Sequence, residues 1–409
     1  MDINRRDLLL SGAGVAAALA VSTPALTQNN PTPAPGLEAA PQPGTGSSDI
    51  SAYEALTNEG RINVVNLREL ELEAKKVLPA FSYAYISGGA GDEWTLRENE
   101  AAFNRWVIEP HYLAGVQAPD LTTSVLGSKL SLPVITAPMG GQGMAHALKE
   151  IPDVKGTDAA GTLYVSSSVS HLSLEEIAAG SGGPKWFQIY FPVNRDYARE
   201  LLQRAKASGF SAIVVTIDGT TFSNRERPMR LGIQAPNLGA GNGVKTPGID
   251  PRTAGDLKAD LNWDDVAFCQ KEARLPVLIK GVLTPALATE AVRRGCAGVW
   301  VSNHGGRAID NSSPAISALP RIAQAVGGKA LIVMDGGVRR GQDVFRALAL
   351  GADVAALGRP VLYGMALGGA QGVEAVYARL KTELRMVMQL AGTATVKAIT
   401  RSYVGRLET

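Results

Sequence analysis

The apolar positions of this chain fall into short runs, separated by longer amphipathic segments. The runs are mostly β-branched and are bounded by Gly, Pro or polar residues, a pattern typical of fully buried parallel strands. We expect strands at Pro133–Pro138, Thr162–Ser167, Lys185–Tyr190, Ala212–Asp218, Pro276–Lys280, Gly298–Asn303, Ala330–Asp335 and Val354–Gly358. The intervening segments include helical patterns at Asp196–Ser208, Thr284–Arg294 and Gly341–Leu350. The alternation predicts successive βαβ units.

Eight such units favour a closed barrel over an open doubly wound sheet. An open dinucleotide-binding sheet would carry GxGxxG after its first strand, whereas this chain has Gly140-Gly141-Gln142-Gly143, which we interpret as a tight loop. We therefore predict the α/β class and a (β/α)8 TIM barrel with an N-terminal helical extension.

The N-terminal segment has the composition of an export signal. Arg5-Arg6 precedes an alanine-rich apolar run that is too short to span a bilayer comfortably, and the pair resembles a twin-arginine signal. We predict a signal peptide at 1–27, a disordered Pro/Gly-rich linker at 28–50, and the barrel domain at 51–409. Because twin-arginine export carries folded proteins, it suits a protein loaded with a cofactor before export to the periplasm.

Composition excludes several other classes. The formal net charge is +2, so no nucleic-acid-binding surface is expected, and apolar residues make up 45% of the 409, enough for a large core. The two cysteines and four histidines show no metal-ligand spacing, so neither a disulfide scaffold nor a protein metal site is predicted. No stable membrane span is expected in the mature chain.

Polar residues gather where the predicted strands end, which is where barrel enzymes place their chemistry. Asp335-Gly336-Gly337-Val338-Arg339 and Gly358-Arg359-Pro360 follow the last two strands, where barrels commonly bind phosphate. Glycines let backbone N–H groups approach a phosphate, and arginines neutralise it. We expect a phosphate group there.

Three further strand-end residues indicate the reaction. Lys280 fits either a Schiff-base nucleophile or a fixed positive charge beside a developing anion. His304 can accept a hydroxyl proton, and Arg307 can bind a carboxylate through two hydrogen bonds.

Several motifs, in order, carry a resemblance to a known family. Ser302-Asn303-His304-Gly305-Gly306-Arg307, together with 83–93, 335–341 and 358–360, resembles the FMN-dependent L-2-hydroxy-acid oxidase and dehydrogenase family over about Leu67–Met388. The segments 363–372 and 387–390 are similar to L-lactate oxidases in particular.

The resemblance implies a role for each matching residue. His304 would be the base, and Asp218 would stabilise its protonated form. Lys280 would place a positive charge at the flavin N1/O2 edge, which favours the fixed charge over the Schiff-base nucleophile for this lysine. Tyr85, Arg225 and Arg307 would bind the substrate carboxylate, with Tyr190 beside the reacting carbon. The implied FMN contacts are Pro138, Met139, Gly140, Ser167, Gln188, Thr216, Lys280, Ser302, Asp335, Gly336, Gly337, Arg339, Gly358 and Arg359.

Two positions depart from the lactate-oxidase pattern. Gly140 stands where those oxidases usually carry alanine, and Val169 stands where an aromatic residue often lines the substrate pocket. The substrate side chain and the electron acceptor, oxygen or a quinone or cytochrome, therefore stay open. A lactate-like oxidase, a mandelate or lactate dehydrogenase and a lactate 2-monooxygenase are the alternatives.

Less closely related functions also fit parts of the pattern. A flavin isomerase or reductase would use the same FMN barrel for different chemistry, and a non-catalytic phosphate- or carboxylate-binding protein would use a degenerate barrel. The resemblance further implies a homotetramer. The Gly-, Pro- and Asn-rich segment Leu231–Asn262 is a candidate lid.

Overall fold

The computed structural model describes residues 56–232 and 241–407. The predicted signal peptide at 1–27 and linker at 28–50 lie outside these residues, as does part of the candidate lid. Among the described residues, no helix combines the length and hydrophobicity needed to cross a membrane.

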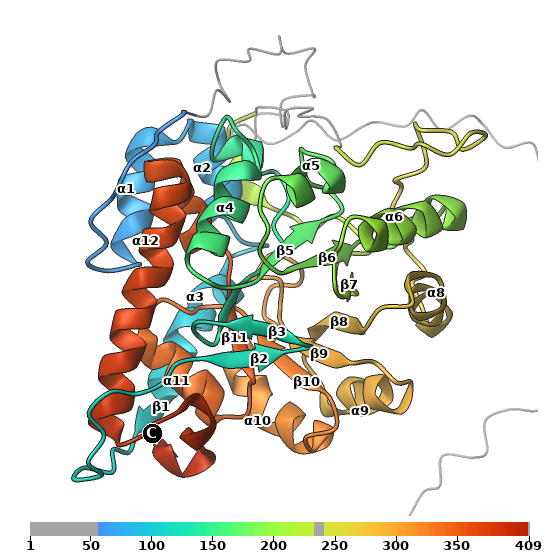
Figure 1. Cartoon of the computed structure of the whole chain (residues 1–409). Coiled ribbons are helices and arrows are strands. Elements are labelled where there is room, and N and C mark those ends of the chain that lie inside the picture. Colours follow the sequence, from blue (N-terminus) through green and yellow to red (C-terminus); the bar gives the residue numbers. More distant parts are fainter. Residues whose placement is uncertain (1–55, 233–240, 408–409) are drawn as a thin grey trace, which may run out of the picture. The chain divides into compact units, whose positions relative to one another are not determined.

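Eight parallel strands form the central barrel (Figure 1), in the spatial order β4-β11-β10-β9-β8-β7-β6-β5. Their bounds are β4 (Val134–Thr136), β5 (Tyr164–Ser167), β6 (Lys185–Ile189), β7 (Ile213–Thr216), β8 (Val277–Val282), β9 (Gly298–Val301), β10 (Leu331–Met334) and β11 (Val354–Leu357). The amide of Thr136 donates to the carbonyl of Leu163 at 2.9 Å, and this bond joins β4 to the start of β5. All eight predicted strands are therefore present, and the predicted barrel is confirmed.

The helices that follow the barrel strands are α4 (Ile151–Ala159), α5 (Leu174–Ala179), α6 (Arg195–Ala207), α7 (Glu226–Met229), α8 (Trp263–Ala273), α9 (Pro285–Arg293), α10 (Ala315–Val326), α11 (Gly341–Ala349) and α12 (Arg359–Ala391). The helix predicted at Thr284–Arg294 is present as α9 and begins where expected. Thr284 caps α9 by accepting from the amide of Leu287, and Pro285 occupies the first turn, where no amide donor is needed. The long α12 is interrupted at Gly368 and Gly369, whose backbone angles are not helical.

An N-terminal extension precedes the barrel, as predicted, with α1 (Glu69–Val77), α2 (Ala80–Ser87) and α3 (Trp94–Ala101). Two small antiparallel sheets were not predicted: β1 (Trp106–Ile108) pairs with β12 (Val404–Arg406), and β2 (Thr123–Val125) pairs with β3 (Ser128–Leu130). Each of these strands has only three residues, too few to show a periodic pattern.

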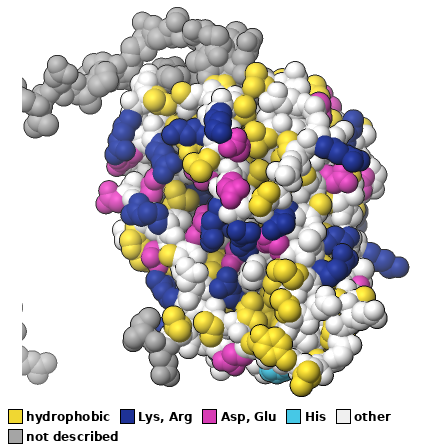
Figure 2. All heavy atoms as spheres, turned by 90° about the vertical axis from the view of Figure 1, so that its left-hand side faces the viewer, with side chains coloured by type: hydrophobic (Ala, Val, Ile, Leu, Met, Phe, Trp, Pro, Cys, Tyr) yellow, Lys and Arg dark blue, Asp and Glu magenta, His cyan; other side chains and the backbone are white. Residues whose placement is uncertain are grey.

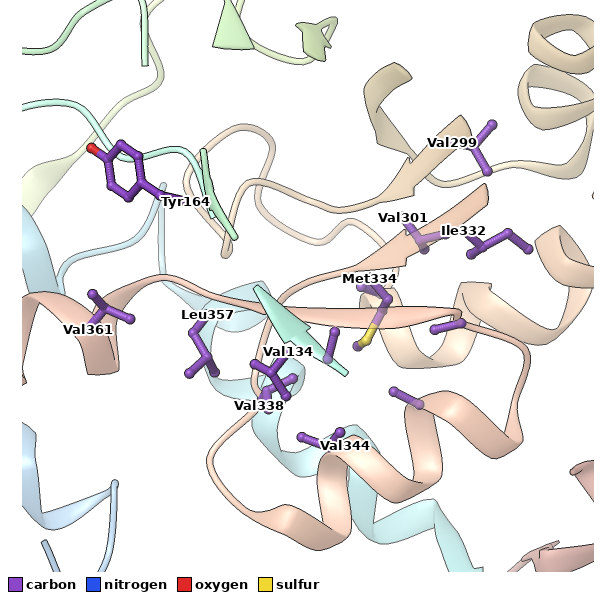
Figure 3. Close-up of a cluster of buried hydrophobic side chains, with 14 of the residues drawn as sticks. Val134, Tyr164, Val299, Val301, Ile332, Met334, Val338, Val344, Leu357 and Val361 are labelled. Atoms are coloured by element: carbon purple, nitrogen blue, oxygen red, sulfur yellow. The ribbon is translucent and has the colours of Figure 1, made fainter. Parts of the chain in front are cut away.

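Side chains alternate between the two faces of each barrel strand, because the strand repeat is two residues. In β6, Trp186 packs in the barrel interior, whereas Phe187 and Ile189 pack outward. Figure 3 shows part of the outward core, in which Met334, Val338 and Val344 lie among strands and helices. On the face shown in Figure 2, basic and acidic side chains are interspersed, consistent with the small net charge.

Candidate active site

A cavity of about 670 Å³ opens among the loops that follow the carboxyl ends of the barrel strands. Its wall includes most of the residues singled out from the sequence: Tyr85, Pro138, Met139, Gly140, Tyr190, Arg225, Lys280, His304, Arg307, Asp335, Gly336, Gly337, Arg339, Gly358 and Arg359. Residues that are distant in the chain thus converge on one space.

His304 is fixed in the cavity wall by both ring nitrogens. Its Nδ1 lies 2.9 Å from Oδ1 of Asp218, and its Nε2 lies 3.1 Å from the hydroxyl of Tyr190. The backbone at His304 has φ of 60°, a left-handed conformation that most side chains avoid, and its amide donates to Oγ of Ser302 at 3.0 Å. The turn therefore holds the imidazole in place.

The surroundings of His304 favour its neutral form. Burial lowers the pKa of His304 below 6.5, and Lys280 and Arg307 lower it further, against the opposing charge of Asp218. Burial would raise the pKa of Asp218, but His304 and Lys280 outweigh it, so that the pKa is lowered and the carboxylate is charged. The pair is consequently a neutral base held by an anion, able to accept a proton at neutral pH.

Two arginines form a cationic corner around Tyr85. Arg307 and Arg225 lie over the Tyr85 ring at 4.9 and 5.6 Å, and Arg225 Nη1 is 3.4 Å from the Tyr85 hydroxyl. Arg307 Nη1 donates to the carbonyls of Tyr85 and Gly88 at 2.6 and 2.9 Å. Burial, followed by the charges of Arg225 and Arg359, lowers the pKa of Arg307. A buried group of cations is stabilised by an anion, so this corner suits a carboxylate.

The loops after β10 and β11 suit a second anion. Gly336 and Gly337 have φ of 101° and 81°, and a Cβ at Gly337 would lie 2.0 Å from the carbonyl oxygen of Asn99. Gly358 precedes α12 without any side-chain cap, which leaves the first amides of that helix without a side-chain acceptor. Arg339 and Arg359 line the cavity at these loops.

A buried polar network leads to Lys280. The ammonium donates to Oγ of Ser302 at 3.0 Å and lies 3.6 Å from Oδ2 of Asp335. Ser302 donates to the other Asp335 oxygen at 2.7 Å, and Trp300 Nε1 donates to Oδ2 at 3.0 Å. These contacts hold the Lys280 side chain beside a carboxylate, which favours the electrostatic interpretation over the Schiff base.

Four predicted cofactor contacts and one predicted catalytic residue lie behind the wall instead of on it. Ser167 donates to Gln188, which donates in turn to Thr216, both at 2.8 Å, and all three are buried. Ser302 and Asp218 are likewise absent from the cavity lining, and they contact Lys280 and His304, which line it. Their direct contact with a cofactor stays a prediction.

These residues fit FMN. The glycine loops and the uncapped helix suit a phosphate, and the buried Lys280 suits an electron-rich ring. The cavity also has walls of the apolar residues Ile86, Met139 and Leu362, as a flat aromatic ring requires. By contrast, the described residues contain no group of three His, Cys, Asp or Glu side chains placed to hold a metal ion.

Some residues of the cavity wall were not predicted from the sequence. Met144, His171 and Phe222 also line the cavity. His171 is one of the four histidines, and the sequence pattern assigned it no role. A usable signal was its place four residues after the predicted strand end at Ser167, in a loop on the same side of the barrel as the other site residues.

Known proteins share this architecture and sequence. L-lactate oxidase of Lentilactobacillus hilgardii is 40% identical over 357 residues, covering 86% of this chain and 96% of its own length. Glycolate oxidase of Spinacia oleracea is 38% identical over 354 residues, covering 84% and 96%. The crystal structure of a lactate oxidase from Pediococcus acidilactici superposes with a TM-score of 0.81 at 37% identity, covering 87% of this chain and 99% of its own.

A crystal structure of mandelate oxidase superposes with a TM-score of 0.78 at 34% identity, covering 84% of this chain and 98% of its own. The sequence profile of the FMN-dependent dehydrogenases matches residues 74–406, which includes the whole barrel and every residue of the cavity described above. The chain belongs to the FMN-dependent dehydrogenase family.

Proposed function

We propose that this enzyme oxidises an L-2-hydroxy acid to the corresponding 2-oxo acid. One observation carries the proposal: His304, a neutral base held by Asp218, lines the same cavity as the cationic corner of Arg225 and Arg307. A 2-hydroxy acid has its hydroxyl and carboxylate on adjacent carbons, so one small molecule can reach both groups.

The protein residues supply binding and proton transfer. Arg225 and Arg307 bind the carboxylate, and His304 Nε2 accepts the hydroxyl proton as the C–H bond is broken. Asp218 stabilises the imidazolium that results, while Tyr190, 3.1 Å from Nε2, orients the hydroxyl. FMN, when bound, would supply the acceptor for the C–H hydrogen and its two electrons, and the Lys280 ammonium would favour the negative charge that they bring.

Relatives support the substrate class. The named relatives are oxidases of L-lactate, glycolate and mandelate, whose side chains range from hydrogen to phenyl. The wall at Gly140 and Val169 carries no aromatic ring, which supports a side chain larger than the methyl of lactate.

Two electron acceptors are candidates. Oxygen is supported by the relatives, which are named oxidases. A respiratory quinone or cytochrome is supported by the twin-arginine signal predicted from Arg5-Arg6, because export would place the enzyme in the periplasm beside such carriers. N-terminal sequencing of protein from the periplasmic fraction tests the export: a mature start near residue 28 supports it, and an intact Met1 in the cytoplasm contradicts it.

Anaerobic titration of the purified holoenzyme tests the reaction. We expect L-lactate or a longer L-2-hydroxy acid to bleach the flavin absorbance, and the D-enantiomer to leave it. Fast recovery in air identifies an oxidase or a monooxygenase, and slow recovery a dehydrogenase. A yellow protein that no hydroxy acid bleaches would contradict the proposal and favour another flavin chemistry; a colourless protein would favour a non-catalytic binding protein.

The homotetramer implied by the family resemblance belongs to the same proposal. Sedimentation or light scattering of the holoenzyme is expected to give four times the mass of the mature chain, and a monomer would contradict it.

A further inference from the structure

His171 is a cavity-lining side chain that the proposed reaction does not use. It lies in the loop after β5, and its Nδ1 accepts a hydrogen bond from the amide of Gly143, in the loop after β4, at 2.8 Å. A Cβ at Gly143 would lie 2.5 Å from the same nitrogen, so glycine is what lets the two loops approach this closely. The imidazole is thus packed against backbone on one side.

The backbone of His171 is held by a buried acid. Glu150 is fully buried, and its two carboxylate oxygens accept from the amides of His171 and Leu172 at 2.8 and 2.9 Å. On the other side of the loop, the buried Asn242 donates to the carbonyl of Ser168 and to Oγ of Ser170, both at 3.1 Å. The orientation of the imidazole is therefore fixed before any substrate binds.

These contacts also define the proton on the ring. Burial, helped by the charge of Lys149, lowers the pKa of His171 to about 4, so the ring is neutral at neutral pH. Since Nδ1 is an acceptor, the single proton lies on Nε2. Within the described part of the chain, no hydrogen-bond partner is found for Nε2, and this N–H is free to bind a ligand.

The cavity that His171 lines has apolar residues in its wall, while Lys149 is a charged neighbour of the imidazole. Gly140, Met144, Val169 and Phe222 line the same cavity, and a Cβ at Gly140 would lie 2.6 Å from Cγ2 of Val169. In the ring of strands, β5 is the neighbour of β6, whose end carries Tyr190, whereas the phosphate loops follow β10 and β11 on the other side of β4. The loop after β5 is therefore placed to contact the side chain of a substrate whose hydroxyl lies at Tyr190 and His304.

We propose that His171 Nε2 donates a hydrogen bond to an uncharged oxygen on the substrate side chain. The preferred substrates are then 2-hydroxy acids with a carbonyl, ether or hydroxyl oxygen beyond carbon 3, held in an otherwise apolar pocket. This inference rests on the proposed function, because it assumes that the hydroxy acid binds between His304 and the two arginines.

Matched substrates test the inference on the wild-type holoenzyme. L-2-Hydroxy-4-oxopentanoate and L-2-hydroxy-4-methylpentanoate differ by a carbonyl oxygen in place of a methyl group, and the 5-oxohexanoate and 5-methylhexanoate pair places the same change one carbon further. We expect kcat/KM to favour the oxo acid about tenfold in at least one pair, the size of one hydrogen bond between neutral groups.

Two variants separate the two ring nitrogens. The amide oxygen of His171→Asn can replace Nδ1 as the acceptor for Gly143, but its side chain does not reach the position of Nε2. His171→Gln places an N–H donor near that position. We expect His171→Asn to lose the preference for the oxo acid and His171→Gln to retain part of it, with the ratio of the two substrates measured in each variant.

The outcomes distinguish this inference from the proposed function. If neither acid bleaches the wild-type flavin, the proposed function itself fails. If both are oxidised with equal kcat/KM at both chain lengths, or if His171→Asn keeps the preference, the role of His171 is overturned while the reaction stands. A preference for a second carboxylate, as in L-2-hydroxyglutarate, would also overturn it. Should His171→Asn fail to fold, the wild-type ratio still decides.

Discussion

The barrel interior contains two layers of side chains, one apolar and one polar, supplied by the same strands. The lower layer includes Val165, Trp186, Val214, Leu278, Trp300 and Val333. Two residues further along the chain in each case, on the strand or just past its end, lie Ser167, Gln188, Thr216, Lys280, Ser302 and Asp335. Both layers are buried, yet only the upper one reaches the cavity, through Lys280 and Asp335.

The two layers differ in how much they contribute to stability, because the upper one buries polar side chains. Burying polar groups is unfavourable unless each finds a partner, and the upper layer meets that condition by bonding to itself, as in the chain from Ser167 through Gln188 to Thr216. The lower layer closes the barrel mainly by packing, and its two polar atoms are indole nitrogens: Trp300 Nε1 donates to Asp335, whereas Trp186 Nε1 has no hydrogen-bond partner among the described residues. We therefore expect substitutions in the lower layer to affect folding and those at the upper face to affect chemistry.

The largest effect is expected from His304→Gln. Removing the base should lower the rate of flavin reduction by ~10²–10⁴, while FMN content stays near that of the wild type. The rate is measured by anaerobic stopped-flow absorbance with L-lactate. Turnover near the wild-type value would exclude His304 as the base.

Leu278→Ala breaks the lower layer. The side chain is fully buried, so its loss should reduce the free energy of unfolding by about 2–5 kcal/mol through lost burial and a residual cavity. Chemical denaturation measures the effect. Leu72→Ala, at a position where the side chain is 62% exposed, is the matched control and should change stability by less than about 0.5 kcal/mol. Equal losses in the two variants would refute the layered packing.

Ser302→Ala tests the connections of the upper layer. The hydroxyl accepts from Lys280 Nζ and from the amide of His304, both at 3.0 Å, and donates to Asp335. Its removal leaves buried donors without a partner, so the free energy of unfolding should fall by about 1–3 kcal/mol, with slower flavin reduction as well. If only stability changes, the network does not position His304 and Lys280 for chemistry.

Gly140→Ala should strain the cavity wall, because the added methyl would meet Cγ2 of Val169 at 2.6 Å. Crowding of this kind costs about 1–3 kcal/mol. Val169→Ala in the same chain should recover part of the loss in thermal stability, because the 3.0 Å contact with the Val169 carbonyl oxygen remains, and a double-mutant cycle measures the coupling. If the effects of the two substitutions on stability are additive, the contact between residue 140 and Val169 is not the cause of the loss.

The smallest expected effect is on the pH profile. Because burial lowers the pKa of His304, its neutral form persists to a pH below 6.5, and kcat/KM should fall only when acid protonates it there. Asp218 opposes this lowering, so Asp218→Asn should move the inflection to still lower pH, in addition to reducing the rate. A shift to higher pH would contradict the assigned pair.

The barrel could be predicted from the sequence because its strands are continuous apolar runs bounded by Gly, Pro or polar residues. The polar residues at those ends, such as Lys280 and His304, stood out for the same reason. The β2–β3 hairpin could not be found, since three-residue strands have no period. His171 was missed because its role depends on the amide of Gly143, which lies 28 residues away in the chain.

Contacts between loops could not be predicted from the sequence either. Gly140 and Val169 were each noticed as departures from the lactate-oxidase pattern, but nothing in their spacing shows that they touch. Ser167, Gln188 and Thr216 were predicted as FMN contacts from the family resemblance, whereas their bonds to one another, behind the cavity wall, follow from the closure of the barrel.

The most direct test compares the two layers in one experiment. Holoenzymes carrying Leu278→Ala or His304→Gln are mixed anaerobically with the best L-2-hydroxy acid at a temperature where both are folded. The account predicts that Leu278→Ala bleaches at close to the wild-type rate, while His304→Gln stays yellow over the same time. If both variants bleach slowly, or if both bleach at the wild-type rate, the separation of chemistry from packing is contradicted.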